Sequence, residues 1–509
     1  MAQWFVGFPS NDRKKRERTF LYDAKDGKKV KEVFWGDWLS VTDASDPDWL
    51  KIVWGPASDA PMTRWFRKSH ATHQRPLEII FLDVGQGDGA VLITPERSSG
   101  AGVSGDGEAI IVIDAGKGDE MHRFLNKRFR AYKDLRQFRA AILTHPDEDH
   151  YGGFRDIFGN PNIGFDCVYQ NGLVERPSGS GFAKVGGVSG GFVTGLAQSR
   201  VDIETHFADP SGFGRRDFPP VMHAALNNAA IRDFAFLARG HGDIEDGRTY
   251  LPGFGPGETR GYTIEVLGPV PEPDATGLPR LRKLGDFAHT KNGHSILLHL
   301  RFGRFKVLFG GDLNAKAEKF LLTHYAGMTE FPDPGTPAYR AMIGKARNWF
   351  KADVMKVCHH GASDVTDAFI ETVKPTAFVI SSGDREGHVH PRPDLLGRLG
   401  KLGSSASPVI LSTELQRSTR EREDKKTLAE LENSILRLTK APTAKRRQKM
   451  LRQVNELGRS NVEVYGTIYL KTDGERLVTA FKKETNSDTD RWFSFEYLLD
   501  ANGDLVPLS

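Results

Sequence analysis

Cysteine is nearly absent from this chain of 509 residues, which contains only Cys167 and Cys358. Two cysteines exclude a disulfide framework and a cysteine-based zinc cluster, and they favour a reducing, cytoplasmic location. The sequence has no run of about 18 consecutive apolar residues, so we expect no transmembrane helix and no membrane partner. No charged segment precedes the apolar patch at residues 4–8, and we therefore expect no secretory signal.

A strong excess of one charge sign is also missing. The chain has 70 Lys and Arg against 66 Asp and Glu, a net charge of +4. This total does not by itself indicate a nucleic-acid partner. Local basic clusters at residues 13–18, 127–130 and 445–452 are candidates for phosphate contacts, although each one alone is also typical of a solvated helix face.

The order of predicted elements divides the chain into three parts. Residues 1–75 contain short aromatic and β-branched runs typical of a small β module. Residues 76–415 alternate between predicted strands and helices, which predicts an α/β domain, with loop-rich insertions near 172–262 and 323–345. Residues 416–509 begin with a highly charged helical segment and end in a predicted β-hairpin, which we treat as a C-terminal extension.

The strongest chemical signal is a loop that follows the buried strand predicted at 140–144. It places His145, Asp147, Asp149 and His150 within six residues. Carboxylates held so close together repel one another unless a cation neutralises them, so the loop predicts a metal site.

Two later segments fit the same site. The apolar strand predicted at 305–309 is followed by Gly310, Gly311 and Asp312, and an Asp at such a position can bridge two metal ions. The strand predicted from Asp353 onwards ends in the pair His359 and His360. Either segment alone is a weak signal, but their order after the His145 loop strengthens the prediction.

With these residues the chain resembles the metallo-β-lactamase superfamily, and within it the soluble hydrolase domain of ComEC-type DNA-uptake proteins. The matching motifs follow the family's order over about residues 77–400, and they lie at residues 81–88, 113–116, 145–150, 292–298, 311–312, 356–361 and 387–391. The N-terminal module more weakly resembles bacterial SH3-like domains, which implies a small β-barrel, and the alternative is an irregular sheet extension. Recruitment of a partner protein and framing of the cleft are the two roles that fit such a module.

The resemblance implies an αββα sandwich with two divalent metal ions, Zn²⁺ or Mn²⁺, at one edge of the sheets. It implies that His145 and Asp147 hold one ion, that Asp149 and His150 hold the other, and that Asp312 bridges them. His359 or His360 completes the coordination of the second ion. His294 is the candidate for a further histidine ligand, although its spacing departs from the family pattern. We also select three residues as catalytic candidates: Asp149, His388 and His390.

This centre suits phosphodiester hydrolysis by a hydroxide held between the ions, so we expect a nuclease or phosphodiesterase that acts on DNA or RNA. Two alternatives stay open. In the first, the same centre hydrolyses another bond, in a lactone, lactam or thioester. In the second, the chain is a non-catalytic component of a defence or regulatory complex. Defence against phage is one of several biological roles that fit, and the sequence does not choose among them or indicate an oligomeric state.

Overall fold

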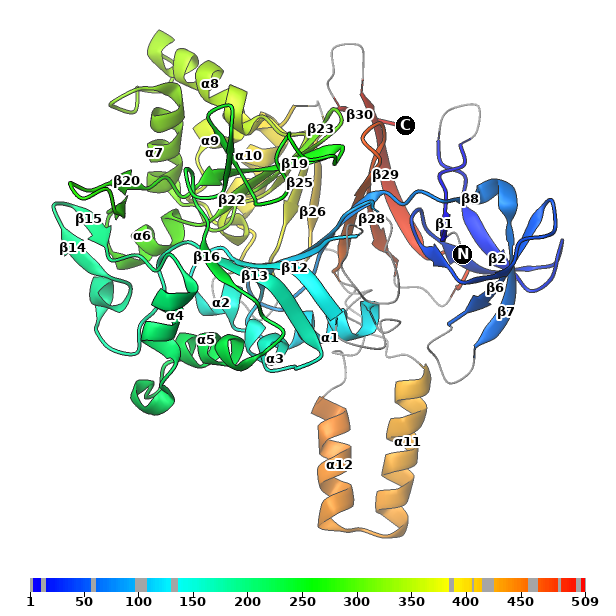
Figure 1. Ribbon diagram of the computed structural model, residues 1–509. Helices are drawn as coiled ribbons and strands as arrows, with labels where there is room; N and C mark the ends of the chain where they lie inside the picture. Colours follow the sequence, from blue (N-terminus) through cyan, green and yellow to red (C-terminus); the bar gives the residue numbers. More distant parts are fainter. Residues whose placement is uncertain are drawn as a thin grey trace.

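Two β-sheets packed face to face form the centre of the protein in this computed structural model (Figure 1). The first has ten strands in the order β16 (Phe234–Phe236), β13 (Ile163–Gln170), β12 (Arg136–Leu143), β11 (Ile110–Ala115), β10 (Gly89–Ile93), β9 (Leu77–Phe81), β27 (Ile468–Thr472), β28 (Leu477–Lys482), β29 (Trp492–Leu499) and β30 (Leu505–Pro507). The second has eight strands in the order β17 (Asp243–Glu245), β18 (Arg248–Tyr250), β19 (Tyr262–Gly268), β22 (Leu297–Phe302), β23 (Phe305–Phe309), β24 (Val354–Lys356), β25 (Ala377–Ile380) and β26 (Val409–Ser412).

The structure describes most of the chain, in these ranges: 3–10, 15–55, 61–96, 108–129, 136–383, 389–404, 407–413, 425–455, 466–483, 487–499 and 505–508.

Helices cover the outer face of each sheet. On the ten-stranded sheet the apolar side chains of four helices share one core with the strands: α1 (Glu120–Arg128), α3 (Phe154–Phe158), α4 (Arg200–Phe207) and α5 (Phe218–Asn227). On the eight-stranded sheet a separate core includes α7 (Ala315–Ala326), α8 (Pro337–Phe350), α9 (Asp367–Val373) and α10 (Pro393–Leu402). A third core lies between the sheets, where Phe81 of β9 contacts Phe309 of β23 with ring centroids 6.0 Å apart. The layers are therefore helix, sheet, sheet and helix, which confirms the predicted α/β sandwich.

The C-terminal strands differ from the predicted extension. They are part of the ten-stranded sheet, because β27 pairs with β9 in antiparallel register from Ile468 opposite Phe81 to Thr472 opposite Leu77. The residues of β27 and β9 at this seam are fully buried, so the strands close the core between the sheets. The local hairpin pattern is visible in the sequence, but its long-range partner is not.

The insertions also contain more regular structure than the loops we predicted. The glycine-rich region near residue 190 forms a small sheet of β14 (Gly187–Ser189), β15 (Phe192–Thr194), β21 (Pro279–Arg282) and β20 (Glu272–Pro273). Most of 323–345 is helical, because α7 continues to Ala326 and α8 begins at Pro337. Thr336 caps α8 by accepting a hydrogen bond from the Tyr339 N–H, and Pro337 at the first helical position needs no such bond.

The N-terminal module contains two antiparallel sheets. The first sheet has five strands in the order β3 (Lys29–Val33), β2 (Thr19–Tyr22), β7 (Met62–Arg67), β6 (Trp49–Trp54) and β5 (Val41–Asp43). The second has three strands in the order β4 (Trp38–Leu39), β1 (Trp4–Val6) and β8 (Ala71–Thr72). The module packs against the C-terminal strands, where Phe34 stacks on Trp492 with centroids 4.4 Å apart. Glu32 accepts hydrogen bonds from the backbone N–H groups of Arg491 and Trp492 at this contact.

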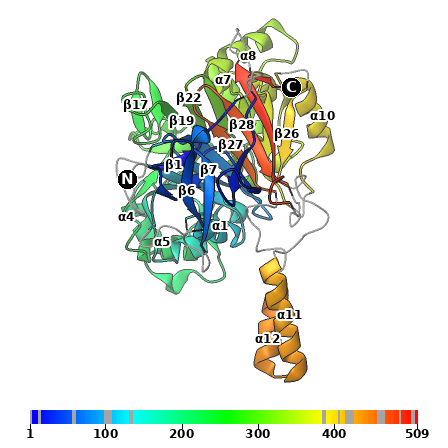
Figure 2. The same cartoon turned by 90° about the vertical axis from the view of Figure 1, so that its right-hand side faces the viewer.

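A helical hairpin, α11 (Lys425–Lys440) and α12 (Ala444–Asn455), stands away from the sandwich in two perpendicular views (Figures 1 and 2). No helix among the described residues is both long and apolar enough to span a bilayer.

Candidate metal centre

The candidate site lies where strand ends from both sheets meet. β11 and β12 are parallel neighbours in the first sheet, and β23, β24 and β25 are parallel neighbours in the second. Parallel strands end at a common edge, so the loops after them bring their polar residues together. Asp114 belongs to the end of β11, Asp312 follows β23, and His360 follows β24.

Four buried residues form the centre of the site: Asp88, His150, Asp312 and His360. One nitrogen or carboxylate oxygen from each lies within 4.8 Å of the corresponding atoms of the other three. The Nε2 atoms of His150 and His360 lie 3.3 Å and 3.2 Å from Asp312 Oδ2. Two imidazoles and two carboxylates converging in this way are a suitable ligand set for a divalent transition-metal ion.

Three other predicted ligands surround this cluster. His145 Nε2 lies 3.5 Å from Asp147 Oδ2 and 3.9 Å from Asp312 Oδ2. Asp149 Oδ2 lies 3.6 Å from His360 Nε2. Among the described residues neither His145 Nε2 nor Asp312 Oδ1 has a hydrogen-bond partner, and such buried atoms are costly unless something binds them. The residues present therefore fit a metal centre, with Asp312 placed between the two groups of ligands.

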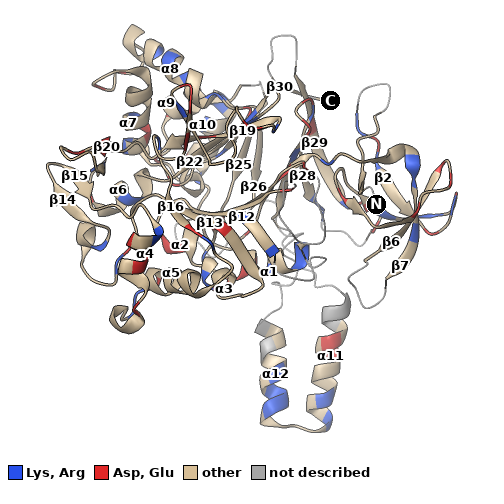
Figure 3. Cartoon of the chain, viewed as in Figure 1, with Lys and Arg blue, Asp and Glu red and all other residues tan. Residues whose placement is uncertain are grey.

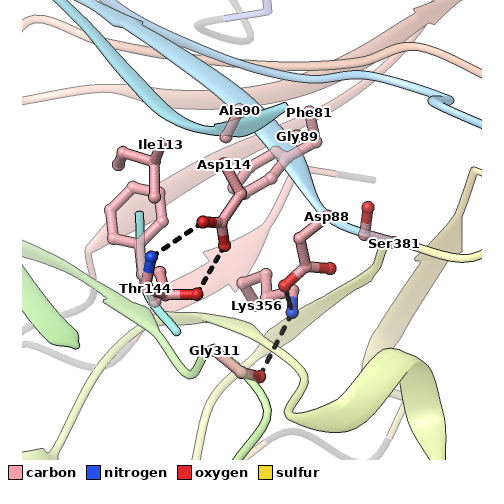
Figure 4. Close-up of a pocket in the computed structure, with 11 residues that line it drawn as sticks. Phe81, Asp88, Gly89, Ala90, Ile113, Asp114, Thr144, Gly311, Lys356 and Ser381 are labelled. Carbon is pink, nitrogen blue, oxygen red and sulfur yellow. Dashed lines mark hydrogen bonds and ion pairs between the residues drawn. The ribbon is translucent and has the colours of Figure 1, made fainter. Parts of the chain in front are cut away.

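Asp114 orients His150. Its carboxylate accepts hydrogen bonds from the N–H and the hydroxyl of Thr144 at 2.8 Å and 2.6 Å (Figure 4). Its Oδ2 also lies 2.8 Å from His150 Nδ1. His360 is oriented similarly, with Nδ1 3.1 Å from the carbonyl oxygen of Ser381. In both histidines the Nδ1 contact directs Nε2 toward Asp312, as outer-shell partners of metal-binding histidines do.

Opposite charges dominate the electrostatics of the cluster in the absence of an ion. Burial alone would raise the pKa of Asp312, but the neighbouring His360 and His150 lower it well below its usual value. Burial likewise disfavours charge on these two histidines, yet Asp312 raises the pKa of each above its usual value. A bound cation therefore competes with the protons on the imidazoles.

Lys356 contributes a buried positive charge to the site. Its ammonium forms an ion pair with Asp88 and lies 3.3 Å from the carbonyl oxygen of Gly311 (Figure 4). Burial opposes charge on Asp88, but Lys356 together with His360 and His150 outweighs it, and the pKa of Asp88 falls to about 2. Asp88 is thus held as a carboxylate within the cluster.

The segment before β22 faces His145 and Asp147 with a lysine, an amide and a hydroxyl. The Lys291 ammonium forms an ion pair with Asp147 and lies 3.3 Å from Glu175 Oε1. With its amide oriented to satisfy both polar atoms, Asn292 donates a hydrogen bond to Asp147 at 2.7 Å. Ser295 Oγ accepts the Asp312 N–H at 3.0 Å and lies 3.3 Å from His145 Nδ1.

His294 does not join the cluster, contrary to our expectation. Its Nε2 lies 2.7 Å from the carbonyl oxygen of Arg282, and burial lowers the pKa of His294 to about 4. Ser295, the next residue, contacts His145 instead. The predicted further histidine is therefore a neutral structural residue in this fold.

The paired histidines point in different directions. His359, His360 and Gly361 have φ values of +47°, +52° and +84°, so the backbone turns sharply after β24. This turn buries His360 in the cluster, whereas the His359 side chain is 30% exposed and its Nδ1 lies 3.2 Å from Asp364 Oδ1. His390 lies beside His359, with ring centroids 6.0 Å apart. His388 lies outside the described residues.

A close approach of two loops requires glycine at position 87. Gly87 has φ of +94°, and a Cβ there would lie 1.6 Å from the carbonyl oxygen of Asp149. The same carbonyl accepts the N–H of Asp88 at 3.2 Å. The glycine turn thus joins Asp88 directly to the loop that carries Asp149.

Our prediction from sequence missed Asp88, Asp114, Lys356 and Lys291 as site residues. A signal existed for Asp88 and Asp114, because both lie in motifs that support the family resemblance. Asp83, in the same motif as Asp88, accepts the Gly85 N–H at 2.9 Å and stabilises the turn. The position of Lys291 depends on the packing of the two sheets, which no local pattern reveals.

Comparison with known proteins matches the part of the chain that contains His150, Asp312 and His360. The family model described as the metallo-beta-lactamase superfamily matches residues 101–361. The chain is 21% identical over 326 residues to ComE operon protein 3 of Bacillus subtilis strain 168. The aligned region covers 63% of this chain and 30% of that protein. The chain therefore spans less than a third of the length of this relative.

Solved structures give low overall superposition scores. The metallo-beta-lactamase fold protein YhfI from Bacillus subtilis is 7% identical, with a TM-score of 0.29, over 66% of this chain and 96% of its own. Tm1679, a metal-dependent hydrolase of the beta-lactamase superfamily, is 12% identical, with a TM-score of 0.28, over 66% of this chain and 95% of its own.

The match of the family model over half of the chain identifies this protein as a member of the metallo-beta-lactamase superfamily. Its site contains four buried residues that are suited to hold a metal ion, and among curated proteins the chain is similar to ComE operon protein 3.

Proposed function

We propose that this protein is a metal-dependent phosphodiesterase that cleaves nucleic acid. The observation that carries the proposal is the buried convergence of Asp88, His150, Asp312 and His360, with two further carboxylates, Asp147 and Asp149, beside it. A centre rich in carboxylates suits ions that bind phosphoryl oxygens, and Zn²⁺ or Mn²⁺ fits its mixture of oxygen and nitrogen donors. The ComEC-like order of motifs supports the same substrate class.

In this proposal each group of residues has a separate task. One ion would be held by His145, Asp147 and Asp312, and a second by the ligands around His150. Divalent ions bound there polarise a phosphoryl group and make a water molecule nucleophilic at neutral pH. Asp114 holds His150 in the orientation that binding requires.

The exposed edge of the site suits a role for His359 and His390. Burial disfavours a charged His359, but the contact with Asp364 raises the pKa of His359 above its usual value. A protonated imidazole here attracts a phosphate. We propose that His390, which lies beside it, contacts the phosphate or transfers a proton to the leaving oxygen.

Cleavage of labelled single-stranded DNA, duplex DNA and RNA tests the proposal, with Zn²⁺, Mn²⁺ and Mg²⁺ supplied separately. We expect cleavage by the wild-type protein and its loss in Asp312→Ala, because this substitution removes the carboxylate between the two groups of ligands. Metal content measured on both proteins shows whether the ions are bound. A metal-loaded wild type that cleaves none of these substrates but hydrolyses a lactone or thioester would replace the proposal with an acyl hydrolase.

A further inference from the structure

The α11–α12 hairpin has almost no core of its own. Among the described side chains of residues 429–455, none is buried. Four apolar side chains are strongly exposed, at 45% for Ile435, 56% for Leu436, 47% for Leu451 and 42% for Val454. Helices normally persist because they bury an apolar face, so this hairpin is suited to contact something outside the chain.

Positive charge is concentrated in the part of the hairpin that includes its free end. Residues 433–455 contain seven of the chain's 70 Lys and Arg and none of its 66 Asp and Glu. The rest of the chain therefore carries 63 basic and 66 acidic residues and is slightly negative. Figure 3 shows the basic residues near the turn between α11 and α12, and acidic residues on α11 further from it.

One arginine holds the turn, and several other cations face solvent. The Arg446 guanidinium donates hydrogen bonds to the carbonyl oxygens of Ala441 and Arg437 at 2.8 Å and 3.4 Å, where α11 ends. A side chain in this position satisfies carbonyl groups that the helix leaves unpaired. Other cations near the turn are exposed and make no such contact with the helix end: Lys440, Lys445, Arg447 and Lys449.

We infer that the free end of the hairpin, residues 437–449, binds the phosphate backbone of a nucleic acid. Nucleic acid is a dense polyanion, and binding by Lys and Arg releases its condensed counterions. This inference rests on the proposed function, because it assigns to the hairpin the task of holding the polymer that the metal site cleaves.

Two other partners fit less well. Pairing of the hairpins of two copies would bring together two clusters of seven positive charges, which repel one another. An anionic membrane would bind the basic residues, but residues 425–455 contain no Trp, Tyr or Phe, and aromatic residues commonly anchor interfacial helices.

The test is a variant that removes four exposed cations and keeps Arg446: Lys440→Gln, Lys445→Gln, Arg447→Gln and Lys449→Gln. Binding is measured by fluorescence anisotropy on labelled single-stranded and duplex DNA in EDTA, over a series of salt concentrations. We expect the variant to bind more weakly, with a slope of log affinity against log salt that is smaller by about 3. Circular dichroism checks that the helices are retained.

A matched control removes the same charge elsewhere on the surface, by Lys28→Gln, Lys51→Gln, Lys345→Gln and Lys401→Gln, all at exposed positions. We expect this control to keep the wild-type salt slope to within about one unit. An equal loss of affinity in both variants would overturn the inference, because total charge and not the hairpin would then drive binding. Unchanged DNA binding in the hairpin variant also overturns the inference. In that case, loss of binding to phosphatidylserine vesicles would indicate a membrane partner, and loss of self-association in mass photometry would indicate a second copy of the chain.

The binding assay contains no metal, so it is independent of catalysis. Turnover of bis(p-nitrophenyl) phosphate with Mn²⁺ reports on the metal site without needing a long polymer. DNA affinity that depends on the hairpin, together with an inactive metal site, would reject the proposed nuclease activity and keep this inference. Active cleavage together with DNA binding that does not depend on the hairpin would keep the proposed nuclease activity and reject this inference.

Discussion

The ion pair between Lys356 and Asp88 offers a direct test of the charge balance in the site. Both side chains are buried, at 5% and 8% exposure, and Lys356, followed by His360 and His150, lowers the pKa of Asp88 to about 2. Lys356→Met keeps most of the side-chain volume and removes the charge. Breaking a buried pair by removing one partner costs about 3–5 kcal/mol, because the other charge is left without compensation.

We therefore expect Lys356→Met to unfold several degrees below the wild type in a chelator, as measured by thermal denaturation. A divalent cation should restore part of this loss, because it replaces a positive charge beside Asp88. An ion at a hundred times its dissociation constant stabilises the folded state by about 2.7 kcal/mol. The stabilisation by Mn²⁺ should therefore be larger in the variant than in the wild type.

The exposed residue Lys345 on α8 provides the matched control, and Lys345→Met should change stability by less than about 0.5 kcal/mol. If Lys356→Met is as stable as the wild type in the chelator, the reasoning fails, because Asp88 then needs no compensating charge. A large loss that Mn²⁺ leaves unchanged would show that Lys356 supports packing and that the ion does not share its electrostatic role.

Three further predictions address proton binding, orientation and close packing. Burial raises the pKa of Glu318 from 4.5 to about 8, so the folded protein keeps a proton that the unfolded chain releases, and stability falls between these pH values. Glu318→Gln should flatten this decline in unfolding measured at pH 5.5 and 8, and an unchanged pH slope would contradict it. Asp114→Asn should weaken metal binding about 10–100-fold in a competitive chelator titration, because His150 loses its carboxylate partner; wild-type affinity would argue against the orienting role. Gly87→Ala should lower the metal content of purified protein, because its Cβ would overlap the Asp149 carbonyl oxygen, and full occupancy would show that the loop adapts.

The central part of the fold was predictable because it depends on local patterns. Buried strands followed by short loops with His or Asp mark β12, β23 and β24, and the order of these motifs indicates the sandwich. The pairing of β27 with β9 joins residues nearly 400 positions apart in sequence, as Thr472 opposite Leu77 illustrates. The hairpin pattern of the C-terminal strands is the same whether they stand alone or close a sheet, so only the tertiary structure distinguishes the two.

The candidate site was predicted in its ligands more than in its supporting residues. The loop from His145 to His150 was found because its residue types are chemically unusual when they stand so close together. The choice between His359 and His360 depended on three successive residues with positive φ, which a sequence with only one glycine among them does not reveal. His294 was selected for its residue type, although the neighbouring Ser295 is the residue whose backbone position brings it to His145.

Asp88 and Lys356 explain why two motifs that are far apart in sequence are needed for one site. Asp88 follows a glycine turn that contacts the Asp149 loop through the backbone, so its carboxylate is fixed relative to the ligands in the first sheet. Lys356 is the last residue of β24, four positions before His360, and is fixed relative to the ligands in the second sheet. The ion pair between them joins the two sheets at the site. Because the pair is buried, loss of either charge would loosen this junction as well as change the local charge, and this links metal binding to the packing of the sandwich.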